Sequence, residues 1–173
     1  TRHGYSAFIR DGKVVFYFAD DEHYYLNQYM VSAASTPTTA PQNAINQLTE
    51  QTQKIARILS LKTGIFHIQF IMSGNVPVII EICRRPPGDL YITLVQHATG
   101  VDYPSWIVRA ACGLDCAGLI QKKVDGYYLR HCVMASRSGV LEDIIVSPSI
   151  KNNIIDSTML WQKGDRVVDH LVA

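Results

Sequence analysis

Two strand-like segments, residues 65–72 and 77–83, carry the side chains whose types and spacing best suit chemistry. In one hairpin register, Gln69 faces Glu81 across the two strands. Because strand side chains alternate between faces, this register gathers the apolar residues on the opposite face. These are Phe66, Ile68, Phe70, Val78, Ile80 and Ile82. A slip of one residue would place Gln69 opposite an apolar side chain, so the segregation supports the register.

Gln69 and Glu81 would bring an amide oxygen next to a carboxylate. Mg²⁺ suits such a pair, because proteins hold it through one or two carboxylates and the phosphates of a nucleotide. Arg84 and Arg85 follow directly, and their guanidinium groups could neutralise a phosphate or a substrate carboxylate. Together these residues suggest the floor of a phosphoryl-transfer site. Taken alone, however, such polar residues on a sheet usually form solvated surfaces and surface ion pairs.

Other interpretations of the same region stay open. His67, Glu81 and Cys83 share one strand face in this register and are acceptable zinc ligands, although no fourth ligand is identifiable. Cys83 packing as a small hydrophobic residue is the simpler reading. Asp89 could bind substrate or cap the helix that follows it, and capping is favoured. Asp102 also stands where a helix cap is needed.

The elements that must position these residues follow from hydrophobic periodicity and turn signals. Helices are expected at residues 41–61, 90–99 and 103–112. Strands are expected at residues 5–10, 13–18, 65–72, 77–83, 127–135 and 139–146, with 154–161 and 166–171 as further candidates. The pair Asp11-Gly12 favours a tight hairpin turn, and residues 19–40 read as a loop with one short strand. This order predicts an α+β fold, an antiparallel sheet with helices on one face.

Composition narrows the class of protein. With 173 residues and 47% hydrophobic content, the chain can bury a core. A net charge of +1 gives no field that would recruit nucleic acid or an anionic membrane, and no apolar run is long enough to span a bilayer. Four irregularly spaced cysteines favour reduced thiols, so we expect a cytoplasmic protein. The chain starts at Thr1 inside a strand-like segment, which suggests a piece of a longer protein.

The order of several motifs resembles the ATP-grasp superfamily, including carbamoyl-phosphate synthetases, biotin carboxylases and carboxylate–amine ligases. In that family a strand bearing Glu, Asp or Gln precedes a strand reading Glu-x-Asn-x-Arg, a glycine-bearing loop, a helix, and Thr-Gly-hydrophobic-Asp before another helix. The matching segments of this chain are residues 64–70, 78–89, 98–103 and 110–113.

The resemblance implies a role for each matching residue. Gln69 and Glu81 align with the residues that bind the nucleotide through its metal, and Arg85, with Arg84 beside it, aligns with the catalytic arginine. Cys83 stands where the family usually has an Asn ligand. A thiol is a poor ligand for Mg²⁺, so Cys83 marks the position of a third ligand without supplying one. Residues 1–113 would form the core of the C-terminal ATP-grasp lobe, and residues 114–173 further strands of it or the start of an appendage.

The function implied by the resemblance is that of a fragment of an ATP-dependent carboxylate–amine ligase, or a related one. Its cofactors would be ATP and Mg²⁺, for which Mn²⁺ could substitute. Its partners would be ATP, a small carboxylate substrate and the missing N-terminal lobe; a homodimer is compatible, and neither nucleic acid nor a membrane is expected. The lysine and glycine-rich loop of the first lobe are not recognisable, so the chain alone should be inactive. The alternative, for which Cys83 is the best argument, is a degenerate nucleotide-binding or interaction module without catalysis.

Overall fold

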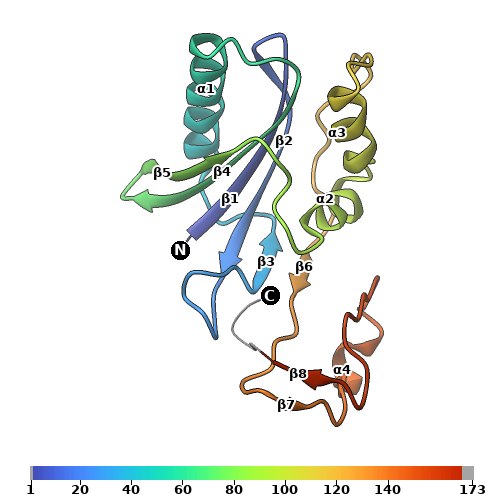
Figure 1. Cartoon of the computed structure of the whole chain (residues 1–173). Coiled ribbons are helices and arrows are strands. Elements are labelled where there is room, and N and C mark those ends of the chain that lie inside the picture. Colours follow the sequence, from blue (N-terminus) through green and yellow to red (C-terminus); the bar gives the residue numbers. More distant parts are fainter. Residues whose placement is uncertain (1, 169–173) are drawn as a thin grey trace.

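A twisted six-stranded sheet dominates the computed structural model, which describes residues 2–168. All neighbouring strands are antiparallel. Across the sheet the order is β5 (Val76–Cys83), β4 (Gly64–Ser73), β1 (Arg2–Arg10), β2 (Lys13–His23), β3 (Ala33–Thr36) and β6 (Tyr128–His131). The central strands β4, β1 and β2 are therefore paired on both sides, whereas β5 forms an edge (Figure 1).

The hairpin of β1 and β2 forms at the predicted turn. Asp11 and Gly12 have φ angles of 52° and 74°, and a two-residue turn with positive φ at both positions matches the twist of the strands it joins. Strand β2 continues to His23, so the segment after Phe18 that was expected to be a loop begins as sheet. This extension brings a run of acidic side chains onto the sheet.

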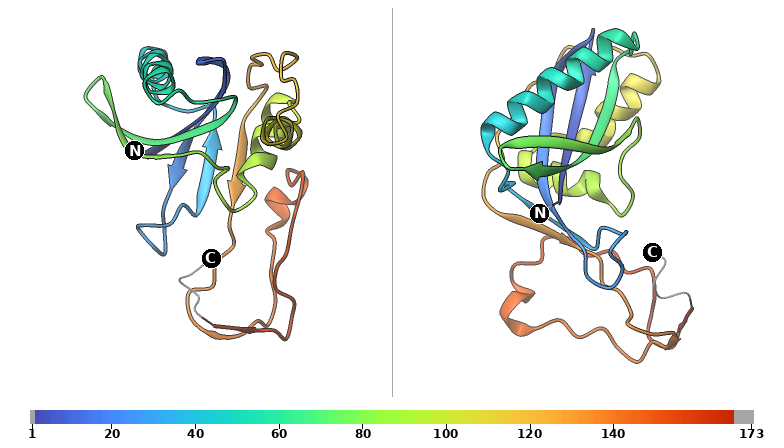
Figure 2. Two further views of the ribbon diagram at one scale, coloured as in Figure 1. Left: turned by 45° about the horizontal axis from the view of Figure 1, so that its top comes forward. Right: turned by 90° about the vertical axis from the view of Figure 1, so that its left-hand side faces the viewer.

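Helices cover both faces of the sheet. Helix α1 (Gln42–Ile58) packs on one face against a cluster that includes Tyr5, Phe66 and Phe70. Helices α2 (Tyr91–Thr99) and α3 (Tyr103–Ala111) pack on the other face against the buried phenylalanines of β1 and β2. The predicted α+β class with an antiparallel sheet is confirmed. Its helices divide between the two faces, where the sequence placed them together, because the central strands are apolar on both sides (Figure 2).

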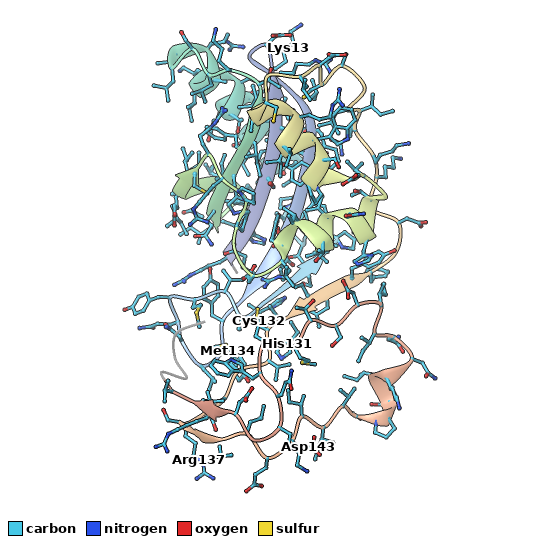
Figure 3. All side chains as sticks on the ribbon, turned by 45° about the vertical axis from the view of Figure 1, so that its right-hand side comes forward. Lys13, His131, Cys132, Met134, Arg137 and Asp143 are labelled. Carbon is cyan, nitrogen blue, oxygen red and sulfur yellow. The ribbon has the colours of Figure 1, made fainter. Side chains whose placement is uncertain are left out.

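The last part of the described chain leaves the sheet after β6 and forms an arm. His131, Cys132 and Met134 lie at this junction, and Arg137 and Asp143 lie farther along the arm (Figure 3). The arm contains a two-stranded sheet and one short helix, namely β7 (Gly139–Val140), α4 (Pro148–Lys151) and β8 (Arg166–Val167). Residues 154–161 form no strand, which corrects that prediction, and residues 169–171 of the last predicted strand lie outside the described residues.

The four cysteines are free thiols, of which Cys116 is buried and Cys112 exposed. The longest helix of the described residues, α1, has 17 residues and a polar outer side. No helix in residues 2–168 combines the length and the apolar character that crossing a membrane requires.

Candidate functional site

The hairpin of β4 and β5 has the predicted register at its functional end. His67 pairs with Cys83, and Gln69 pairs with Glu81. A bulge then shifts the pairing between Gln69 and Phe70, so Phe70 lies opposite Ile79. A bulge inserts one extra residue into a strand and re-aims the side chains beyond it. The predicted register is thus confirmed for the polar pairs and wrong beyond them.

The apolar face of this hairpin is only partly buried. Phe66, Ile68 and Phe70 of β4 are at most 1% exposed in the cluster under α1. Their predicted companions on β5 are exposed, at 43% for Val78, 54% for Ile80 and 41% for Ile82. The predicted apolar face is therefore buried on β4 but not on β5. The physical reason is the bulge together with the edge position: the pairing shift places Ile79, not Val78 or Ile80, against the core.

A row of residues crosses four neighbouring strands at the candidate site. Asp20 of β2 pairs with Gly4 of β1, Gly4 pairs with Gln69 of β4, and Gln69 pairs with Glu81 of β5. Paired residues of adjacent strands share a face of the sheet. A Cβ atom at position 4 would lie 2.5 Å from the Asp20 Oδ1 atom, so glycine leaves the space that the Asp20 carboxyl occupies.

Glu22, two residues farther along β2, links this row to the first proposed magnesium ligand. Its side chain is buried, and its Oε1 atom accepts a 2.8 Å hydrogen bond from Nε2 of Gln69. The Oε2 atom accepts a 2.6 Å hydrogen bond from the Tyr24 hydroxyl. The guanidinium carbon of Arg2 lies 4.5 Å from the centre of the Tyr24 ring, a cation–π distance that helps to hold the tyrosine.

Asp20 is fully buried beside this group. Its Oδ1 atom accepts a 2.7 Å hydrogen bond from the Tyr91 hydroxyl of α2, and its Oδ2 atom has no hydrogen-bond partner. Burial raises the pKa of the Asp20 carboxyl to about 7, and the nearby charge of Glu22 adds to the increase. Burial disfavours the ionised form because protein surrounds it instead of water. Asp20 is therefore a carboxyl that changes charge near neutral pH.

His67 lies on the same face, and its ring meets the Tyr91 ring edge to face at 5.4 Å. Burial lowers the pKa of His67 to about 4, and the positive charge of Arg85 acts in the same direction. Its Nδ1 atom has no hydrogen-bond partner, while the Cys83 thiol points to the backbone oxygen of Arg85 at 3.6 Å. Within residues 2–168, no three His, Cys, Asp or Glu side chains are grouped so that they could hold a metal ion. The zinc alternative built on His67, Glu81 and Cys83 is therefore not supported.

The two arginines after β5 diverge. Arg84 folds back and donates two 3.3 Å hydrogen bonds to the backbone oxygen of Lys62, beside Gly64. Partial burial lowers the pKa of its guanidinium. Arg85 is exposed, donates to the Pro86 backbone oxygen at 3.1 Å, and lies close enough to affect His67 electrostatically. Of these two arginines, Arg85 is the one whose charge acts on His67 of the candidate site.

Asp89 does not cap α2, which corrects the prediction for this residue. The cap position is Leu90, which makes no side-chain capping bond. The Asp89 carboxylate instead forms a 2.8 Å ion pair with Arg130 of β6, 41 residues away along the chain. Asp102 does cap α3, as predicted, by accepting a hydrogen bond from the Ser105 backbone nitrogen.

Sequence reasoning missed Asp20, Glu22 and Arg130. One signal was available, because Phe16, Phe18, Asp20 and Glu22 alternate as residues of one strand face do. The approach of Arg130 left no such signal, because it depends on how β6 joins the sheet.

The donor set of Gln69 and Glu81 fits Mg²⁺. Glu81 is an exposed carboxylate, and the Gln69 amide has its nitrogen engaged by Glu22, which leaves its oxygen as the free acceptor. Such hard oxygen donors are what Mg²⁺ requires, with the remaining positions filled by water or phosphate. Cys83 does not fit, because its soft sulfur faces the Arg85 backbone.

Comparison with solved structures identifies the fold, although no protein-family model matches the chain. Phosphoribosylglycinamide synthetase from Anaerococcus prevotii aligns with a TM-score of 0.80 and 20% identity, over 96% of this chain and 44% of that one. L-amino acid ligase from Bacillus licheniformis aligns with a TM-score of 0.73 and 12% identity, over 96% and 42%. These structures are ATP-grasp proteins.

The chain has an ATP-grasp fold. A third ATP-grasp structure is the biotin carboxylase domain of 2-oxoglutarate carboxylase from Hydrogenobacter thermophilus, a complex with MgADP, ADP and bicarbonate. It aligns with a TM-score of 0.69 and 16% identity, over 98% of this chain and 39% of that one. The chain described here thus spans less than half the length of each of these solved chains.

Proposed function

We propose that this chain is the C-terminal lobe of an ATP-dependent carboxylate–amine ligase, or a closely related ligase, and supplies its Mg-ATP-binding floor. The observation that carries the proposal is the pairing of Gln69 with Glu81 on the sheet face that also bears the charge of Arg85. The ATP-grasp fold gives this pairing its context, since the similar structures include ligases and a carboxylase domain bound to MgADP.

Each residue has a distinct part in the proposed reaction. Gln69 and Glu81 would hold Mg²⁺, for which Mn²⁺ could substitute, and the bound cation would neutralise charge on the nucleotide phosphates. Arg85 would orient and stabilise the phosphoryl group during its transfer to a substrate carboxylate, a role suited to a guanidinium fork. An amine would then displace phosphate from the acyl-phosphate. Arg84, tied to the Lys62 backbone, would instead fix the start of the loop that carries Arg85.

The second candidate is an ATP-grasp module that binds nucleotide without catalysis. The observation in its favour is Cys83, which offers a thiol where the family has an oxygen ligand and turns that thiol to a backbone carbonyl. This module would bind Mg·ATP through Gln69 and Glu81 and release no ADP.

Calorimetric titration of the full-length parent with Mg·ATP, paired with an ADP-release assay over a panel of carboxylates and amines, tests both functions. We expect Glu81→Ala to lower Mg-dependent turnover roughly 100-fold or more, as loss of a group that organises transition-state charge does. Glu50→Ala, at an exposed position of α1, is the matched control. Binding without turnover over the whole panel would favour the non-catalytic module, and full activity of Glu81→Ala would remove the metal assignment.

A further inference from the structure

We propose that Glu22 is a positioning residue that orients the side-chain amide of Gln69 so that its oxygen, rather than its nitrogen, faces the cation. This inference rests on the proposed function, because it concerns the same cation. It adds a residue of β2 that neither the motif order nor the resemblance pointed to. The juxtaposition that carries it is the 2.8 Å hydrogen bond from Gln69 Nε2 to Glu22 Oε1.

The need for a positioning residue follows from the chemistry of glutamine. Its amide presents an oxygen that can bind a cation and a nitrogen that cannot, on two arms of nearly the same shape. Rotation by half a turn exchanges the two arms. A glutamine ligand therefore needs a neighbour that distinguishes them, whereas a glutamate ligand is symmetric and needs none.

Glu22 makes this distinction because an ionised carboxylate only accepts hydrogen bonds. With the Gln69 nitrogen toward Glu22, the contact is a charge-assisted hydrogen bond, which is about twice as strong as a neutral one. With the oxygen toward Glu22, two acceptors would face each other at the same distance. The Gln69 oxygen is consequently turned away from Glu22 of β2, and β4 has Glu81 of β5 on its other side.

Glu22 is itself held in place. Its second oxygen accepts the Tyr24 hydroxyl at 2.6 Å, the Arg2 guanidinium lies over the Tyr24 ring, and Glu22 is only 7% exposed. Each carboxylate oxygen of Glu22 already accepts a hydrogen bond, so the proposed role of Glu22 is to act through Gln69. Its paired neighbour on β3 is the small residue Ala34.

The test uses a double-mutant cycle in the full-length protein, with Glu22→Gln and Gln69→Glu as the two changes. In Glu22→Gln, residue 22 can donate or accept, so both orientations of Gln69 find a partner. We expect the Mg²⁺ concentration that half-saturates ATP binding, measured by calorimetry, to rise about 10-fold, as it does when outer-shell partners of metal ligands are changed. The Mg²⁺ dependence of ADP release should shift by the same factor.

In the Gln69→Glu background the prediction has the opposite sign. The ligand is now a symmetric carboxylate with nothing to orient, and the ionised Glu22 repels it. Adding Glu22→Gln should therefore leave the Mg²⁺ requirement unchanged or lower it. A purely structural role of Glu22 would instead raise the Mg²⁺ requirement in both backgrounds alike. The thermal unfolding midpoint of each variant, and of Tyr24→Phe, is measured as well. It separates a loss of fold from a loss of orientation.

The outcomes are distinct. An equal rise in the Mg²⁺ requirement in both backgrounds, or no rise in the wild-type background, overturns the positioning role. Mg·ATP binding and ADP release by the wild type would in that case still support the proposed function. Failure of the wild type to bind Mg·ATP at all refutes the proposed function, and the positioning role with it.

Discussion

Asp20 should make the stability of this protein depend on pH in an unusual direction. Its pKa in the folded state, about 7, is above the ordinary value of 3.8. A carboxyl with a raised pKa contributes stability that is fully present below pH 3.8 and is lost as the pH rises through about 7. Replacing Asp20 with Asn, which keeps the size of the side chain and its acceptor for the Tyr91 hydroxyl, should remove this dependence.

The magnitude follows from the pKa change. A shift from 3.8 to about 7 corresponds to about 4 kcal/mol of unfolding free energy lost between mildly acidic and mildly alkaline pH. His67 acts in the opposite sense, because folding lowers its pKa from 6.5 to about 4. It therefore adds about 3 kcal/mol to the unfolding free energy above pH 6.5, and this contribution is lost as the pH falls through 4. The two effects oppose each other over one pH window, so they partly cancel in the wild-type profile.

Urea denaturation of wild type and Asp20→Asn at several pH values between about 4 and 8.5 measures the effect. The free energy of the variant minus that of the wild type should grow in favour of the variant by about 4 kcal/mol over this range. Asn also places an amide nitrogen where Oδ2 lacks a partner, which adds a constant penalty and leaves the slope unchanged. Glu50→Gln on the exposed side of α1 is the control. A difference that stays constant within about 1 kcal/mol would refute the assignment of a neutral, buried Asp20.

Two further predictions concern the packing around the site. Gly4→Ala should lower the unfolding free energy by about 1–3 kcal/mol in urea denaturation, because its Cβ would lie 2.5 Å from the Asp20 carboxyl. The control is Gly139→Ala, whose Cβ would have no atom within 4 Å and which should leave the unfolding free energy nearly unchanged. Arg130→Leu should cost roughly 2–4 kcal/mol in the same assay by leaving the part-buried Asp89 carboxylate unpaired. Adding Asp89→Asn to Arg130→Leu should recover part of that loss; additive losses would contradict the ion-pair account.

Local chemistry explains why some elements could be predicted from the sequence. Asp11-Gly12 specifies the first hairpin through residues that tolerate positive φ, and the structure has positive φ at both. The pairing of Gln69 with Glu81 was predictable because a one-residue slip would mix apolar and polar side chains on one face. Helix α1 follows from apolar residues at three- and four-residue spacing, and its buried positions repeat that spacing.

The other half of the site depends on contacts that no local pattern contains. Asp20 and Glu22 lie in an acidic run, and acidic residues are depleted in strands, so a loop is predicted for this segment. The strand-like alternation that includes Phe18 nevertheless continues into it. The surroundings of Asp20 depend on Gly4 in the neighbouring strand β1 and on Tyr91 in α2, 71 residues farther along the chain. The bulge after Gln69 likewise has no local sequence signal, and so the predicted faces of β5 failed beyond it.

The two proposed cation ligands differ in how firmly the fold holds them. Gln69 lies on β4, which is paired on both sides, and Glu22 fixes its amide. Glu81 lies on the edge strand β5, paired on one side only, and its carboxylate is exposed to water. One oriented amide oxygen and one hydrated carboxylate are too few ligands to strip water from Mg²⁺, which needs the phosphates of the nucleotide as well. The cation should therefore bind together with ATP rather than before it, and the orientation of Gln69 by Glu22 becomes decisive only in that complex.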